Sequence, residues 1–280
     1  MRVFLTGASG YVGSHVAMEL LARGHEVIGL ARQPSERTKY DAAVQWCFGD
    51  LSDPSTFWDQ MEKVNAVVHC AMDYSASGEN AELDRQFVDQ MSEYEGHFVY
   101  TGNLFAHRSS TTLEESLIGD GENWRFQSEA AAMDRKGPSS VIRLGFVYGG
   151  KGGYLWEILS PGTLAGLESD SIPDVLWPMI HVRDVASLYA TVLGAHGSGV
   201  FHAFDGERAT AANIIKTARS IYESHGVTGT ESHDYLMGLL KSSVETTNQR
   251  ALSIGWNPEH SSFARNAALA YSEYAEQPSR

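Results

Sequence analysis

Three glycines near the amino terminus, Gly7, Gly10 and Gly13, have a spacing that can hold a phosphorylated ligand. The apolar run 3–5 precedes them and predicts a buried strand, and a helical pattern over 12–23 follows. In such a unit the first glycine permits the tight turn, the second lets the backbone approach the phosphates, and the third allows close helix–strand packing. The free N–H groups at the start of the helix then face the anion. Because the glycines fall at the first strand-to-helix crossover, they predict a dinucleotide site rather than an ordinary loop.

The second predicted strand indicates which dinucleotide binds. A cofactor with a free ribose 2′-hydroxyl usually meets Asp or Glu at the end of this strand, but this chain has Ala31 and Arg32 there, with Arg37 and Lys39 shortly after. A guanidinium suits a 2′-phosphate because its planar fork can make paired hydrogen bonds to phosphate oxygens. The sequence therefore favours NADP(H) over NAD(H). The alternative is that Arg32 is a solvated loop arginine.

Strands and helices alternate over the first half of the chain. Strands are predicted at 2–6, 26–30, 44–48, 66–70, 97–101 and 139–144, with helices at 12–23, 54–62, 81–94 and 122–136. This order predicts an α/β fold, a Rossmann-type doubly wound parallel sheet with a small C-terminal substrate lobe. Further helices are predicted at 183–194, 210–224 and 246–254, the last with Gly255 as its C-cap. We expect one unit over 1–280, in which 1–150 mainly bind the dinucleotide, 151–280 mainly form the lobe, and 180–205 return to the Rossmann part.

Composition and charge limit the classes of function. The 280 residues are 42% hydrophobic and 20% charged, which is ordinary for a soluble globular protein. Lys and Arg number 21 against 35 Asp and Glu, and the net charge of −14 disfavours nucleic acid or an anionic membrane as a partner. Two cysteines are too few for a disulfide framework, no apolar run is long enough to span a bilayer, and no metal-ligand spacing is present. We therefore expect a cytoplasmic protein with a small-molecule substrate and no bound metal.

Several motifs in the right order resemble the extended short-chain dehydrogenase/reductase family, also called the NAD-dependent epimerase/dehydratase family, over most of the chain. They are Thr6-Gly-Ala-Ser-Gly-Tyr-Val-Gly13, Gly49-Asp-Leu51, Val67-Val-His-Cys-Ala71, Val141-Ile-Arg-Leu-Gly-Phe-Val-Tyr-Gly149, Ile180-His-Val-Arg-Asp-Val-Ala186 and Gly255-Trp-Asn-Pro258. The resemblance implies cofactor contacts by Gly7, Ser9, Gly10, Tyr11, Val12, Gly13, Arg32, Asp50, Leu51, Cys70, Ala71, Met72, Thr101, Leu144, Phe146 and Val147. A homodimer formed by a helix pair is also common in this family, although this sequence does not itself show one.

The catalytic positions depart from the family pattern. On the helix after the fifth strand, the family has a Tyr that acts as acid/base and, four residues later, a Lys that lowers the pKa of that Tyr. This chain has Asn123-Trp-Arg-Phe-Gln-Ser-Glu-Ala130 there. One alignment puts Trp124 and Ser128 at the two positions, and a shift by one puts Arg125 and Glu129 there. The segment is similar to a subgroup with Trp-Arg-x-x-x-Glu in this helix and Asp-Tyr after the fourth strand, here Asp73-Tyr74.

Reduction of a carbonyl needs a proton donor near its oxygen, so other side chains become candidates. Tyr74 and Tyr148 are the phenols expected near the nicotinamide side. Thr101 and Asn103 can hydrogen-bond a substrate carbonyl, or they can merely satisfy the end of the fifth strand. Arg125 stays protonated and can stabilise an oxyanion. We favour the alternative that it forms an internal ion pair with the glutamate four residues later.

The loosely patterned part of the chain holds an apolar set that would favour an apolar substrate if it faces the site; the alternative is that it forms the lobe core. The set is Trp156, Leu159, Leu164, Leu167, Leu176, Trp177 and Met179. Three hypotheses for function remain. The leading one is an NADP(H)-binding oxidoreductase for a small, fairly apolar carbonyl or hydroxyl metabolite, with a non-standard proton donor. The others are a non-redox isomerase, cyclase or lyase that keeps the nucleotide structurally, and a catalytically silent NADP(H)-sensing binding protein.

Overall fold

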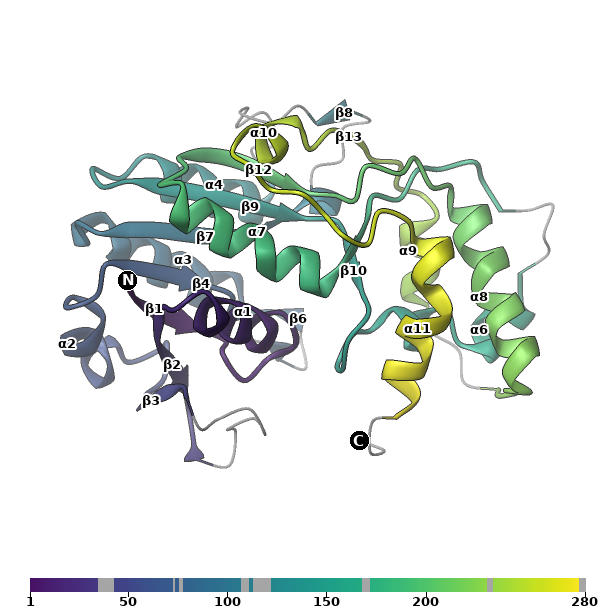
Figure 1. Ribbon diagram of the computed structural model, residues 1–280, viewed down its shortest axis with the longest axis horizontal. Coiled ribbons are helices and arrows are strands. Elements are labelled where there is room, and N and C mark those ends of the chain that lie inside the picture. Colours follow the sequence, from purple (N-terminus) through teal and green to yellow (C-terminus); the bar gives the residue numbers. More distant parts are fainter. Residues whose placement is uncertain are drawn as a thin grey trace.

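A seven-stranded sheet forms the centre of the computed structural model, which describes residues 1–34, 43–72, 74–75, 78–106, 111–112, 122–167, 172–230 and 234–276 (Figure 1). In spatial order the strands are β12 (Gly199–Ala203), β9 (Ser139–Leu144), β7 (His97–Asn103), β4 (Ala66–His69), β1 (Arg2–Thr6), β2 (Glu26–Ala31) and β3 (Gln45–Phe48). Every neighbouring pair is parallel. The predicted Rossmann-type α/β fold is confirmed.

Helices cover both faces of this sheet. One face is packed by α1 (Tyr11–Ala22) and α7 (Val182–Gly194), and the other by α2 (Trp58–Met61), α3 (Ala81–Gln90) and α4 (Trp124–Met133). Successive side chains of a strand point to opposite faces, and accordingly Val3 and Leu5 join the core under α1 and α7, whereas Phe4 packs beneath α2 and α3. All three side chains are fully buried. The apolar run at the start of the chain is therefore buried on both sides, as parallel sheets require.

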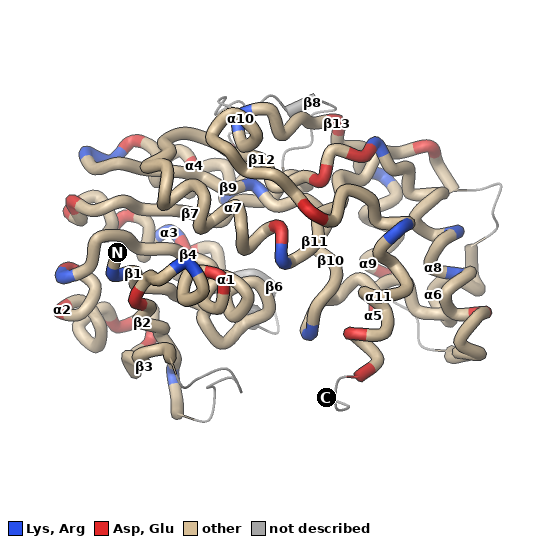
Figure 2. The backbone as a smooth tube through the Cα atoms, viewed as in Figure 1, with Lys and Arg blue, Asp and Glu red and all other residues tan. Residues whose placement is uncertain are grey.

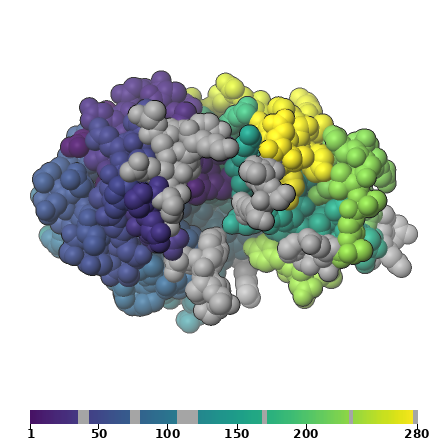
Figure 3. All heavy atoms as spheres, turned by 90° about the horizontal axis from the view of Figure 1, so that it is seen from below, coloured from purple at the N-terminus to yellow at the C-terminus, as the bar shows by residue number. Residues whose placement is uncertain are grey.

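A second lobe has its own apolar core beside the sheet. It contains α5 (Leu155–Ile158), α6 (Pro161–Ala165), α8 (Ala211–His225), α9 (Tyr235–Leu239), α11 (Phe263–Ala275) and the small sheet of β10 (Phe146–Tyr148) and β11 (Met179–His181). Figure 3 shows this green and yellow half beside the purple and blue half that carries β1 to β4. Short elements complete the chain: η2 (Pro54–Thr56), β5 (Tyr74–Ser75), β6 (Gly78–Glu79), η3 (Met91–Glu93), η4 (Leu104–Ala106), β8 (Thr111–Thr112), β13 (Glu245–Thr246) and α10 (Gln249–Ser253).

Some predicted boundaries were wrong. The helix expected over 246–254 is only α10, because Thr246 belongs to β13 and pairs with β8. Gly255 does end α10, with φ +89°. The helix expected over 54–62 divides at Phe57, whose φ of −137° is not helical, into η2 and α2. Sequence reasoning missed α11 and the edge strand β12, which follows α7 and pairs with β9.

Charged residues of both signs are distributed over both parts of the fold (Figure 2). In the part of the chain that the structure describes, no helix combines the length and apolar character needed to cross a membrane. The cytoplasmic location, the lack of nucleic-acid and membrane partners, and the homodimer stay predictions.

Candidate functional site

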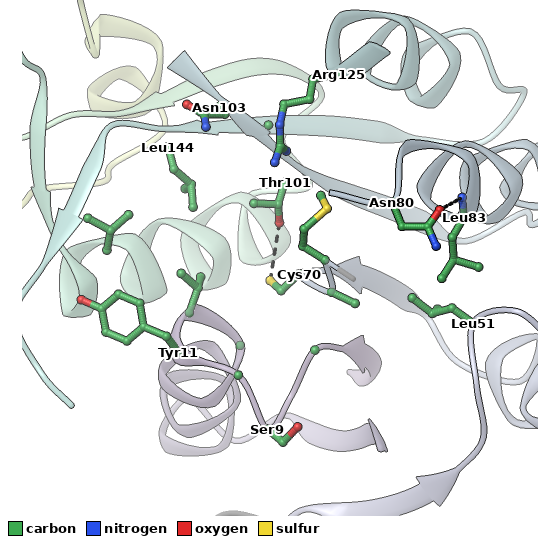
Figure 4. Close-up of a pocket in the computed structure, with 18 of the residues that line it drawn as sticks. Ser9, Tyr11, Leu51, Cys70, Asn80, Leu83, Thr101, Asn103, Arg125 and Leu144 are labelled. Carbon is green, nitrogen blue, oxygen red and sulfur yellow. Dashed lines mark hydrogen bonds between the residues drawn. The ribbon is translucent and has the colours of Figure 1, made fainter. Parts of the chain in front are cut away.

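A cavity of about 910 Å³ lies at the carboxyl ends of the parallel strands, where α/β sheets usually bind their ligands. All of the residues that the sequence predicted as cofactor contacts line it. Figure 4 shows how Ser9 and Tyr11 from the glycine loop, Cys70 after β4 and Thr101 of β7 approach the cavity from separate elements. Tertiary structure thus brings together the predicted binding residues, and their contacts with a cofactor stay predictions.

The glycine loop has the backbone that a pyrophosphate site requires. Gly7 has φ +69°, and a Cβ atom there would lie 2.7 Å from the backbone nitrogen of Ala71. A Cβ atom on Gly13 would overlap the carbonyl oxygen of Gly7. The first N–H bonded back into the helix is that of Ser14, which donates to the oxygen of Gly10 at 2.9 Å. The N–H groups of residues 11–13, at the start of α1, are therefore the donors that a helix presents to an anion.

On the strand next to the glycine loop, the end of β2 carries a cation where NAD-binding folds usually carry an acid. Arg32 directly follows β2, is exposed and lines the cavity with Asp50, which follows β3. Hydrogen bonds from the Ser52 hydroxyl (2.6 Å) and N–H (2.9 Å), and then the charge of Arg32, lower the pKa of Asp50. The position of Arg32 fits a 2′-phosphate. Arg37 and Lys39 lie outside the described residues.

Beneath the cavity lies a buried polar network that sequence reasoning missed. The Thr6 hydroxyl lies 2.8 Å from His69 Nδ1, His69 Nε2 lies 3.3 Å from Asp84 Oδ1, and the Tyr100 hydroxyl donates to Asp84 Oδ2 at 2.9 Å. Burial alone would raise the pKa of Asp84, but hydrogen bonding and charge from His69 lower it. Because Thr6 Oγ1 also accepts the Ala71 N–H at 3.2 Å, the network joins the glycine loop to β4, α3 and β7. The sequence signal that could have revealed this network is Asp84, an aspartate within the amphipathic pattern of α3.

Thr101 and Asn103, which the sequence offered as candidates for contact with the substrate, lie at the end of β7 and line the cavity. The Thr101 hydroxyl is held by the protein itself, since its Oγ1 lies 2.5 Å from the His69 carbonyl oxygen and 2.6 Å from the Tyr189 hydroxyl. Asn103 Oδ1 accepts the Phe105 N–H at 2.8 Å, which leaves its amide NH₂ group as the donor. Asn103 is therefore better placed than Thr101 to hydrogen-bond a substrate.

The helix α4 stands where the family resemblance would place the catalytic Tyr/Lys pair, and it carries other side chains there. Arg125 lines the cavity, and the guanidinium carbon lies 4.6 Å from the centroid of the Trp124 ring. Glu129 is fully buried, and its Oε2 accepts from Arg143 Nε at 2.8 Å. A Cβ atom on Gly102 would overlap the Glu129 carboxylate, so Glu129 faces β7, and Arg125, one turn earlier, lines the cavity where Trp124 does not. In the structure Glu129 pairs with Arg143. From the sequence we had favoured an ion pair of Glu129 with Arg125.

Of the two candidate phenols, Tyr148 has a side chain that the structure describes, and Tyr74 does not. Tyr148 is fully buried and does not line the cavity; its ring packs edge-on against His181 (5.2 Å) and Phe263 (5.1 Å). Burial also raises the pKa of Tyr148. Tyr148, a candidate acid from the sequence, therefore has its side chain in the lobe core and not in the cavity. The Tyr74 side chain and Asp73 lie outside the described residues.

Of the two alternatives for the apolar set, the structure supports the lobe core. None of Trp156, Leu159, Leu164, Leu167, Leu176, Trp177 and Met179 lines the cavity, and most of them form the lobe core. Other lobe residues take that place: the cavity wall is completed by Phe105, Phe146, Tyr154, Ile158, Tyr235 and Leu239. The wall is nevertheless apolar and aromatic. In the described residues, no group of three His, Cys, Asp or Glu side chains is arranged to hold a metal ion.

The structure thus combines a Rossmann-type sheet, a second lobe beside it and a cavity at the carboxyl ends of the strands. The model of the NAD dependent epimerase/dehydratase family matches residues 3–96. An uncharacterised protein of Saccharomyces cerevisiae is 26% identical, with 97% of this chain and 99% of that protein covered. The human epimerase family protein SDR39U1 is 25% identical, with 78% and 79% covered.

Solved structures of extended short-chain dehydrogenases/reductases share the fold over nearly the whole chain. The UDP-glucose 4-epimerase of Thermotoga maritima with UDP-glucose has a TM-score of 0.74 and 17% identity, with 98% of both chains covered. Human SDR39U1 (isoform 2) with NADPH has a TM-score of 0.69 and 20% identity, with 99% of this chain and 100% of that chain covered. The chain has the Rossmann-type fold of these extended short-chain dehydrogenases/reductases, and its residues 3–96 are similar to the NAD dependent epimerase/dehydratase family.

Proposed function

We propose that this protein is an NADP(H)-dependent oxidoreductase that acts on a small, fairly apolar carbonyl or hydroxyl compound without the usual Tyr/Lys pair. The observation that carries the choice of cofactor is Arg32, a cation on the cavity rim at the end of β2, where a free 2′-hydroxyl would favour an acid. The human relative whose structure contains NADPH supports this choice. A Thermus thermophilus UDP-glucose 4-epimerase of the same fold is in complex with NAD, so the fold alone does not select the cofactor.

Bound NADPH would supply the hydride, and the residues of the chain would bind and orient the reactants. The N–H groups of residues 11–13 hold the pyrophosphate, and Arg32 holds the 2′-phosphate. At the other end of the cavity, Asn103 donates to the substrate oxygen and the Arg125 charge stabilises its developing negative charge. The phenols of Tyr154 and Tyr235, which also line the cavity, replace Tyr148 as candidate proton donors.

The cofactor preference is tested by titrating NADPH and NADH into the native protein and the Arg32→Gln variant. Loss of a charged, bidentate contact should weaken NADPH about 10- to 100-fold, whereas the affinity for NADH should change less than about 3-fold. Arg23→Gln, on the far end of α1, is the matched control because Arg23 pairs with Glu19 and does not line the cavity. Equal losses for both nucleotides, or no loss for NADPH, would refute the role of Arg32.

The redox function is tested by NADPH oxidation across a panel of aldehydes and ketones. Tight cofactor binding without turnover of any of them would count against it. A second candidate is a non-redox isomerase, cyclase or lyase. It is favoured because α4 lacks the Tyr/Lys pair of the redox enzymes and carries Glu129, which is held by Arg143. That candidate predicts the same product with NADP⁺, with NADPH and without nucleotide, so a strict requirement for one redox state would exclude it.

A further inference from the structure

Three members of the buried polar network form a line of hydrogen bonds that ends at the glycine loop. They are Thr6, His69 and Asp84, none of them more than 4% exposed. The His69 ring stacks on the rings of Phe87, with centroids 4.3 Å apart, and Tyr100, with centroids 5.9 Å apart. These contacts hold the imidazole in one plane, so each of its nitrogens faces a fixed partner.

The hydrogen bonds of Thr6 assign the proton on His69. Thr6 Oγ1 accepts the Ala71 N–H at 3.2 Å, so its own hydrogen points to its other partner, His69 Nδ1, at 2.8 Å. Because Nδ1 is then an acceptor, the ring proton lies on Nε2, which is 3.3 Å from Asp84 Oδ1. An ionised carboxylate can only accept, and the other oxygen of Asp84 accepts from the Tyr100 hydroxyl. Each donor in the line therefore points toward Asp84.

The Ala71 end of this line touches the glycine loop. A Cβ atom on Gly7 would lie 2.7 Å from the Ala71 nitrogen, so the turn and the chain after β4 are in direct backbone contact. Gly7 and Ala71 both line the cavity. Since Gly7 directly follows Thr6, the side chain that holds the Ala71 N–H also fixes the residue that begins the turn. The N–H groups of residues 11–13, which face the pyrophosphate, follow from this turn.

We propose that Asp84 is a positioning residue for the dinucleotide, because its carboxylate selects the Nε2–H form of His69. That form lets Thr6 hold the Ala71 N–H and, with it, the turn at Gly7. This inference rests on the proposed function and deepens it, since it names what holds the cofactor loop in its binding geometry. Asp84 does not line the cavity, so it acts through two other side chains and not by contact with the nucleotide. Without its carboxylate the ring proton would move to Nδ1, and the hydrogen of Thr6 would lose its acceptor.

The proton on His69 is located in the native protein labelled with ¹⁵N-histidine. Long-range proton–nitrogen spectra distinguish the two neutral forms of an imidazole, and the signals of His69 are those missing from the His69→Gln variant. We expect the proton on Nε2. A proton on Nδ1 in the native protein would overturn the inference, whatever the other variants do.

NADPH titrations measure what the line contributes to binding. Asp84→Leu should weaken NADPH binding about 10-fold and move the His69 proton to Nδ1, because a buried hydrogen bond to a charged acceptor is lost. Asp84→Asn should restore most of the affinity and the Nε2–H form, because its amide oxygen can still accept. Thr6→Val removes the hydroxyl at nearly constant shape and should weaken binding by a similar factor, and Thr6→Ser should restore it. The double variant with Asp84→Leu and Thr6→Val should bind about as weakly as either single variant, because both break one line.

Tyr100→Phe is the matched control, since the Tyr100 hydroxyl bonds the other oxygen of Asp84. It should lower stability but leave the NADPH affinity and the Nε2–H form unchanged, and an equal loss of affinity in this variant would overturn the inference. Unchanged NADPH affinity in folded Thr6→Val would also overturn it, even if Asp84→Leu fails to fold, while the proposed function would stand. A native protein that binds no NADPH would overturn the proposed function and this inference together.

Discussion

The buried pair of Glu129 and Arg143 gives a prediction whose size follows from the structure. Both side chains are fully buried, and Arg143 Nε and Nη2 each lie 2.8 Å from Glu129 Oε2. Replacing Arg143 with Met leaves a carboxylate in the interior without its cation. Breaking a buried pair in this way costs about 3–5 kcal/mol, which lowers the melting temperature of a domain of this size by roughly 6–15 °C.

The assay is a double-mutant cycle followed by thermal and urea unfolding. Glu129→Met and Arg143→Met should each destabilise the protein, because each removes one member of a buried ion pair. The double variant should lose much less than the sum of the two, since two methionines fill similar lengths without charge. As a control, Arg85→Met should cost less than about 1 kcal/mol, because the Arg85–Asp89 pair is half exposed.

Additive costs in the double variant would refute the reasoning, as would a loss below about 1 kcal/mol for Arg143→Met alone. Either result would show that the pair does not stabilise α4 against β9. The helix that positions Arg125 would then need another explanation for its placement.

Three further predictions concern the loop and the buried titratable groups. Gly13→Ala should abolish NADPH binding in calorimetry, because its methyl would overlap the Gly7 carbonyl; Gly194→Ala in α7, where no atom lies within 4 Å, should retain it, and retention by both would contradict the loop geometry. Burial raises the pKa of Asp205 to about 7, so the folded state keeps a proton that the unfolded state releases above about pH 4, and stability falls as the pH rises through 7. Asp205→Asn should therefore gain stability relative to the native protein between pH 5 and 8 in urea titrations, and a pH-independent difference would exclude this. Burial lowers the pKa of His181 to about 3, so the unfolded state binds the extra proton and stability falls by about 2 kcal/mol from pH 7 to pH 5; His181→Gln should remove that part of the pH slope, and an unchanged slope would argue against it.

Residues whose role depends on the local backbone were predictable. Gly7, Gly10 and Gly13 identified the loop because positive φ and the absence of Cβ are properties that one residue type supplies. The apolar runs of β2 and β4 predicted where these strands end, so Arg32 and Cys70 were placed correctly at the cavity. Residues whose role depends on long-range contacts were not predictable in the same way.

Three features of the site show what only the tertiary structure decided. Tyr148 lies outside the cavity because its ring packs against His181 and Phe263, both more than thirty positions later in the chain. Arg125, and not Trp124, lines the cavity because the side of α4 that carries Arg125 and Glu129 faces β7, where the Glu129 carboxylate lies against Gly102. Tyr235 enters the cavity wall from α9, far along the sequence. A strand or helix pattern fixes spacing along one element, whereas the direction of a side chain depends on which distant segment packs against it, and no local pattern contains that information.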